Sequence, residues 1–160
     1  AVVTAPATCS ILRHQPDDRG CFSEGTPVEA AEWLLEHPPR GTVLAMYEWS
    51  DFLVWAGPPD TRPLVGSHAH LLPESVWQDY WAVIHVEPRW RSVLAKYGVS
   101  TIVLDRNRAI ALSARLADDP AWRLDYQDRQ AEVWTSDRPK SAAGPRRGGP
   151  SSHSAAGTGS

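Results

Sequence analysis

Acidic, imidazole and guanidinium side chains follow three apolar runs of the sequence that predict buried β-strands. In open α/β sheets, ligands bind beyond the carboxyl ends of parallel strands. If the three strands are parallel and adjacent, these side chains converge on one edge of the sheet and form a ligand-binding cluster. They are Glu48, Trp49 and Asp51 after the first run, His68 and His70 after the second, and Asp105 and Arg106 after the third.

The same residues also have a purely structural interpretation. Asp51 and Asp105 each stand where a helix begins, so either could cap that helix or act as a first-turn acid. Arg106 would then be a surface residue or the ion-pair partner of one of them. Trp49 and Trp55 flank the short helix predicted after the first strand, and an indole ring can stack on the apolar face of a sugar.

The pair His68 and His70 could place two imidazoles on one side of an extended segment. With Glu74 or Asp51 as a third ligand, they would resemble part of a zinc site. The spacing fixes no third ligand, so two surface histidines bonded to backbone carbonyls are the alternative. We predict no metal ligand on this pattern alone.

Motifs that would carry catalysis are absent from the sequence. It contains no glycine-rich phosphate loop, no Gly-x-Ser-x-Gly, no His-Glu-x-x-His and no Cys-x-x-Cys. We therefore assign no catalytic residue and no cofactor to this chain.

The tryptophans are unusually many, at eight. Helical or strand periodicity predicts that four of them lie in the core. Trp33 and Trp134, if exposed, could instead contact a membrane-embedded partner, because tryptophan favours membrane interfaces. The four expected in the core are Trp77, Trp81, Trp90 and Trp122.

Helix and strand patterns alternate along the chain. Helices are predicted from Pro27, over Trp49 to Ala56, from Pro73, from Pro88 and after Asp105. Alternation of this kind predicts a compact three-layer α/β sandwich with helices on both faces of a mixed sheet of about five strands. The predicted strands are Thr42 to Tyr47, Pro63 to Val65, Val99 to Leu104, and a final antiparallel hairpin of residues 122–126 and Ala131 to Thr135.

Length and composition fit one domain. The chain has 160 residues and a net charge of −3, which gives no electrostatic reason to expect a nucleic-acid partner. Residues 26–138 form the predicted α/β domain, residues 1–25 a linker and residues 139–160 a disordered Gly/Ser/Pro-rich tail. Cys9 and Cys21 could be bridged in an oxidising compartment, although two cysteines leave the free state equally open.

Several short motifs together resemble one family over about 110 residues. They are Trp-x-x-Phe-Leu-x-Trp from Trp49, Trp-x-x-Tyr from Trp77, Tyr-Gly-Val from Tyr97 and Trp-x-x-x-Tyr-x-Asp from Trp122. Their order resembles the C-terminal extramembrane domain of bacterial multi-spanning proteins of the GT-C superfamily, which includes the dolichyl-phosphate-mannose–protein mannosyltransferase-like group. Related sequences often have Asp-Gly-Arg where this chain has Gly66-Ser67-His68.

This resemblance implies a non-catalytic accessory domain on the extracytoplasmic face of a bacterial cell membrane. The parent enzyme would move a sugar from a polyprenyl-phosphate donor, and its catalytic Asp would lie in an early loop that this chain lacks. The implied partners are the membrane-embedded part of the same polypeptide and, with it, a polyprenyl-phosphate sugar or glycan acceptor. Residues 1–25 would then leave the last membrane helix. Two alternatives are an independent glycan-binding module that uses the strand-end cluster and a small metal-dependent hydrolase.

Overall fold

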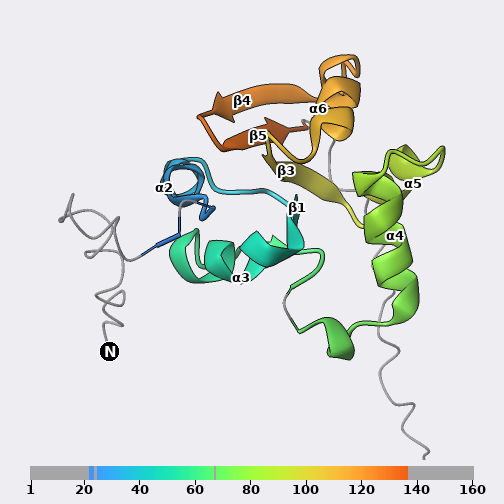
Figure 1. The fold of residues 1–160 in the computed structure, drawn as a ribbon, viewed down its shortest axis with the longest axis horizontal. Coiled ribbons are helices and arrows are strands. Elements are labelled where there is room, and N and C mark those ends of the chain that lie inside the picture. The colour runs from blue at the N-terminus through green and yellow to red at the C-terminus, as the bar shows by residue number, and fades with distance from the viewer. Residues whose placement is uncertain (1–21, 24, 67, 137–160) are drawn as a thin grey trace, which may run out of the picture.

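A five-stranded mixed sheet forms the middle layer of the protein (Figure 1). The structure is a computed structural model, and it describes residues 22–23, 25–66 and 68–136. The strand order is β2-β1-β3-β5-β4, in which β1 pairs in parallel with β2 and β3, and β5 pairs antiparallel with β3 and β4. The strands are β1 (Thr42–Ala45), β2 (Arg62–Pro63), β3 (Val99–Asp105), β4 (Arg123–Gln127) and β5 (Ala131–Thr135).

Helices cover both faces of this sheet. The connection from β1 to β2 and the connection from β2 to β3 run in opposite directions across the sheet. Right-handed crossovers therefore place α3 on one face and α4 with α5 on the other, and Figure 1 shows this separation. The helices in the described part are α2 (Val28–Glu36), α3 (Tyr47–Ala56), α4 (Glu74–Ile84), α5 (Trp90–Lys96) and α6 (Ile110–Ala117).

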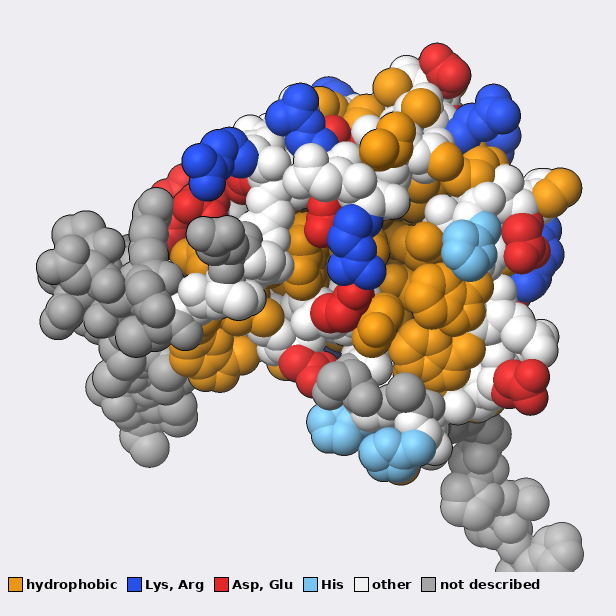
Figure 2. All heavy atoms as spheres, viewed as in Figure 1, with side chains coloured by type: hydrophobic (Ala, Val, Ile, Leu, Met, Phe, Trp, Pro, Cys, Tyr) orange, Lys and Arg blue, Asp and Glu red, His pale blue; other side chains and the backbone are white. Residues whose placement is uncertain are grey.

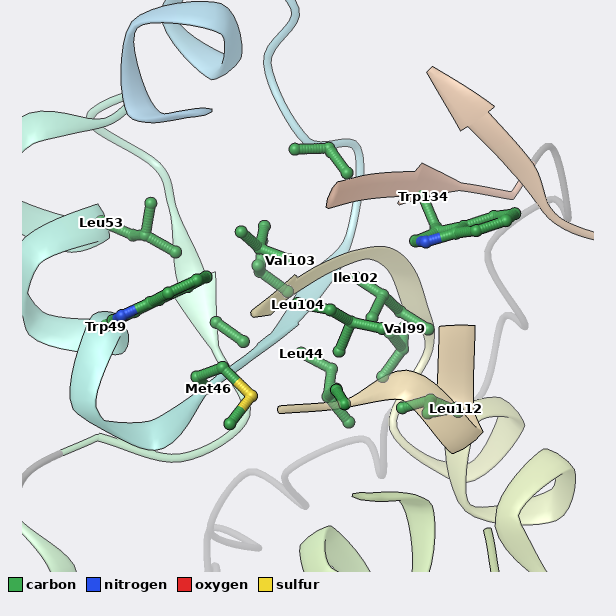
Figure 3. Close-up of a cluster of buried hydrophobic side chains, with 14 of the residues drawn as sticks. Leu44, Met46, Trp49, Leu53, Val99, Ile102, Val103, Leu104, Leu112 and Trp134 are labelled. Atoms are coloured by element: carbon green, nitrogen blue, oxygen red, sulfur yellow. The ribbon is translucent and has the colours of Figure 1, made fainter. Parts of the chain in front are cut away.

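The core lies on both sides of β3, because its side chains alternate between two helical layers. Val103 faces α3, where Trp49 and Leu53 pack against it (Figure 3). Ile102 and Leu104 face the opposite layer, together with Leu112 of α6 and Trp134 of β5. Six of the seven residues of β3 are buried, and only Ser100 is partly exposed.

A buried carboxylate links α4 to the α5 region. Asp79 is 5% exposed and accepts hydrogen bonds from Lys96 Nζ at 2.6 Å and from Tyr97 Oη at 2.9 Å. Arg89 Nη1 contacts its other oxygen. These donors hold the pKa of Asp79 at about 2, well below its ordinary value of 3.8.

The predicted fold class is confirmed, and the final hairpin lies where it was expected. The first strand is shorter than predicted, since Tyr47 already begins α3, and the second strand is Arg62–Pro63 rather than Pro63 to Val65. The possible Cys9–Cys21 bridge, residues 1–21 of the predicted linker and the predicted tail lie outside the described residues.

Burial of the tryptophans follows the prediction only in part. Trp90 is 3% exposed, as expected, and Trp77 and Trp122 are partly buried against the core. Trp81 is 38% exposed, so its assignment to the core was wrong. Trp134 is 5% exposed because β5 lies inside the sheet, between β3 and β4, and it is therefore not available to a membrane-embedded partner.

Candidate functional site

The carboxyl ends of β1 and β3 bring together only part of the predicted cluster. Glu48, in the first turn of α3, forms an ion pair with Arg108, with 2.7 Å between Glu48 Oε1 and Arg108 Nη1. The two side chains are 32% and 56% exposed, so this pair faces solvent. The hydrogen bond to Glu48 raises the pKa of Arg108.

Asp105 shapes the turn that follows β3 and does not cap α6. Its Oδ1 accepts hydrogen bonds from the backbone N–H groups of Asn107 at 2.9 Å and Arg108 at 3.2 Å. The N-cap position of α6 is Ala109, so the helix starts too far along the chain for Asp105 to cap it. Asp105 is buried, and its role here is to present Arg108 toward Glu48.

Arg106 turns away from this ion pair. Its backbone N–H donates to Gln130 O at 2.8 Å, and its Nη1 donates to Asp128 O at 3.4 Å. Both acceptors lie in the β4–β5 turn. Arg106 therefore fixes the hairpin against the end of β3 and does not join the predicted cluster.

Trp49 belongs to the core, so the prediction that it contacts a ligand was wrong. It is 5% exposed, and its Nε1 donates to Gly25 O at 2.8 Å. Helix α3 begins at Tyr47, two residues before the predicted start. Trp49 and Leu53 lie one helical turn apart on the buried side of α3, and Tyr47 lies on the surface.

The two predicted histidines lie on the surface at the short 3-10 helix η2 (Ala69–Leu71). Both are exposed, and the ring centroids of His68 and His70 are 6.3 Å apart. Within the described residues, no group of three or more His, Cys, Asp or Glu side chains is placed to hold a metal ion. Asp51 instead lies against Gly66, where an added Cβ would be 3.1 Å from Asp51 Oδ1.

An aromatic surface occupies the edge where the predicted cluster was expected. Tyr47 is 37% exposed, and its ring lies 6.0 Å from that of Trp77 and 6.2 Å from that of Trp81. Tyr80 lies beneath them, fully buried, and its hydroxyl accepts a hydrogen bond from Tyr47 N at 3.0 Å. Burial raises the pKa of Tyr80 well above its ordinary value. Figure 2 shows this apolar surface between the start of α3 and α4, bordered by a basic and an acidic side chain.

A second apolar surface lies at the other end of α3. Trp55 and Val54 are 50% and 49% exposed. The ring of Phe22 lies 5.5 Å from that of Phe52 and 6.2 Å from that of Trp55. Of the two tryptophans predicted to flank a ligand site, Trp49 and Trp55, only Trp55 is accessible. We call these two separate apolar surfaces, Tyr47 with Trp77 and Trp81 and Val54 with Trp55, jointly the aromatic face.

A hollow of about 600 Å³ opens at the opposite edge of the sheet, by the amino ends of β1 and β3. Trp33 and His37, from the end of α2, form one side of it, with parallel rings 4.2 Å apart. Arg40, Ser100 and the ion pair of Arg123 with Asp125 also line this hollow. Nothing in the sequence pattern predicted this hollow, because it forms where segments distant in the chain meet.

The displaced pKa values belong to groups that hold elements together. Arg123, with the hydroxyl of Thr135, lowers the pKa of Asp125 and so keeps this carboxylate charged. Burial, together with a hydrogen bond to Asp128, raises the pKa of Tyr126. A general acid or base would need a pKa near the working pH and a position facing a substrate. None of these shifted groups in the described part of the chain meets both conditions.

Comparison with known proteins identifies no family. The chain matches no protein-family model, no curated protein and no solved structure. No helix in the described ranges has the length and apolar character needed to cross a membrane.

Three residues at the carboxyl edge of the sheet were not predicted as surface or site residues: Tyr47, Trp81 and Arg108. Arg108 lies only two residues beyond the predicted Arg106. The turn that Asp105 holds places Arg108, and not Arg106, next to Glu48. Tyr47 was assigned to a strand, and Trp81 to the core. Only the prediction of a helix that begins directly after Met46 could have placed Tyr47 on the surface.

Proposed function

We propose that this chain is a non-catalytic extracytoplasmic accessory domain of a bacterial membrane glycosyltransferase-like protein that uses a polyprenyl-phosphate sugar donor. Its aromatic face packs against the membrane-embedded part of the same polypeptide. The exposure of this face is the observation that carries the proposal. The resemblance of the motif order to GT-C extramembrane domains supplies the identity of the partner.

The aromatic face has the composition expected next to a membrane surface. Its most exposed rings are Trp55 at 50%, Trp81 at 38% and Tyr47 at 37%. Tryptophan and tyrosine combine an apolar ring with a polar atom and are enriched at membrane–water interfaces. Large exposed apolar surfaces on soluble domains mark sites that contact proteins or membranes.

The path of the chain agrees with this placement. The N-terminal end of the described domain, at Phe22, packs on Phe52 and Trp55. A segment arriving from a preceding membrane helix would therefore reach the domain beside the aromatic face. The face would then be covered by the part of the polypeptide to which the domain is tethered.

The charged side chains support a role without catalysis. Glu48 is paired with Arg108, Asp105 is bonded to its own turn, and Arg106 is bonded to the hairpin. Each of these predicted site residues thus stabilises the local structure. Among the described residues, none of them forms a nucleophile–base pair.

Photo-crosslinking in native membranes tests the proposal directly. A benzophenone amino acid replaces Trp55 in the full gene product, and the matched control replaces Ala114, an exposed residue of α6. We expect crosslinks from position 55 to membrane-embedded segments of the same polypeptide and none from position 114. Equal yields of crosslinked product from both positions would contradict the proposal. So would the absence of any crosslink from position 55.

A further inference from the structure

We infer that the hollow at the amino ends of β1 and β3 binds a small organic anion, a carboxylate or phosphate ester carried on a flat ring. This inference is independent of the accessory role proposed above, because the hollow lies at the opposite edge of the sheet from Tyr47 and Glu48. Its volume of about 600 Å³ lies within the range of about 300–1,000 Å³ usual for small-molecule sites.

A rigid aromatic pair provides the flat side of the hollow. The rings of Trp33 and His37 are 4.2 Å apart and within 10° of parallel. His37 Nδ1 also lies 3.0 Å from Trp33 O, which holds the imidazole in this stack. The Trp33 ring is also 5.8 Å from that of Tyr126, at a tilt of 33°. Rings held in this way lose little conformational entropy when a planar ligand stacks on them.

The charges around the hollow favour an anion. Asp125 is the only acidic side chain that lines it within the described residues, and Arg123 and Thr135 already engage its oxygens. Arg123 Nη2 donates to Asp125 Oδ2 at 3.1 Å, so this pair is neutral overall. Arg40 lines the same hollow and has no ion-pair partner in the described part of the chain. A guanidinium is suited to carboxylate or phosphate because it can donate two parallel hydrogen bonds.

A buried hydroxyl group beside the hollow also lacks a partner in the described part of the chain. Ser100 Oγ is buried, and among the described residues nothing lies within hydrogen-bonding distance at a suitable angle. Buried polar atoms in folded proteins are nearly always hydrogen-bonded. Ser100 lines the hollow, and contact with a ligand requires its χ1 angle to change so that this hydroxyl reaches a ligand oxygen.

NMR titration of the whole ¹⁵N-labelled chain tests this site. The probes are benzoate, phenyl phosphate, inorganic phosphate and benzyl alcohol. We expect benzoate or phenyl phosphate to shift the Trp33 indole N–H and the Ser100 and Thr101 amides in a saturable way. Trp33→Phe identifies the indole signal, and the tighter of the two anions identifies whether the site prefers carboxylate or phosphate.

Two arginine variants separate a specific site from general charge. Arg40→Gln should weaken binding of the preferred anion about tenfold, the order expected for loss of one charge-assisted contact. Arg115→Gln removes an equally exposed arginine from α6 and should leave binding unchanged. Equal binding by Arg40→Gln and wild type would overturn the inference. So would binding of inorganic phosphate or benzyl alcohol as tight as that of the ring-bearing anions, or no saturable shift at these residues.

Discussion

Replacing Asp79 with asparagine should remove a part of the folding stability that depends on pH. Asp79 is almost fully buried, and its pKa is lowered to about 2 chiefly because Lys96 donates a hydrogen bond to it, with Tyr97 and Arg89 adding to the effect. A carboxyl group whose pKa is lower in the folded state binds its proton more readily in the unfolded state. It therefore stabilises the fold above its unfolded pKa of 3.8, and this stabilisation disappears as the pH falls through about 2.

The size of the effect follows from the two pKa values. A difference between 3.8 and about 2 corresponds to about 2.4 kcal/mol at neutral pH. Arg89 and Lys96 are 46% and 58% exposed, so solvent screens their attraction for Asp79. We therefore expect about 1–2 kcal/mol, of which about half remains near pH 3 and little remains near pH 2.

Urea unfolding followed by tryptophan fluorescence measures this contribution. The free energy of unfolding is compared between wild type and Asp79→Asn at about pH 5, 3 and 2, and the difference between them isolates Asp79 from other carboxylates. Lys96→Gln keeps the carboxylate but removes its main donor, so it should retain only part of the pH dependence. If the difference in the free energy of unfolding between wild type and Asp79→Asn stays constant from pH 5 to pH 2, the assigned network is refuted.

Three further substitutions test the packing. Trp90→Ala should lower the free energy of unfolding by about 3–5 kcal/mol in urea, because Trp90 is 3% exposed, and a loss below about 1 kcal/mol would contradict its place in the core. Gly98→Ala should cost about 1–2 kcal/mol, measured as a lower Tm, because φ is +60° there while no atom lies within 4 Å of the added Cβ; an unchanged Tm would contradict the strain. Tyr80→Phe should cost about 1–2 kcal/mol and speed hydrogen exchange of the Tyr47 amide, which loses its acceptor at 3.0 Å; unchanged exchange would show that another group accepts this bond.

The regular elements could be predicted where local pattern and burial agree. Val99 to Leu104 contains four apolar residues in six, and β3 is buried by helices on both faces. The alternation around Leu124 likewise predicted the edge strand β4, but not its exposure, since Leu124 itself is 38% exposed. In these segments the local pattern determines the type of element.

The errors arise where exposure depends on neighbouring elements. Trp77 and Trp81 lie on one broad apolar stripe of α4, and periodicity cannot say which margin of the stripe remains uncovered. Trp134 lies on the return strand of a hairpin, but β5 sits inside the sheet and is buried on both faces. Trp49 lies in the core, where its Nε1 donates to Gly25 O, a contact that no local pattern predicts.

The candidate sites show the same limit. The sequence identified the carboxyl edge of the sheet, but the Asp105 turn determines that Arg108, and not Arg106, meets Glu48. The hollow beside Arg40 requires the end of α2 to meet β4 and β5. Side chains that far apart in sequence carry no shared periodic pattern.

Reading the coding DNA upstream of Ala1 in its native genome tests the central claim most directly. The accessory-domain proposal predicts several apolar segments of about twenty residues, each long enough to span a bilayer. It also predicts an acidic residue in the first extracytoplasmic loop between them. A start codon close to Ala1, with no such segments in the same reading frame, would contradict the proposal.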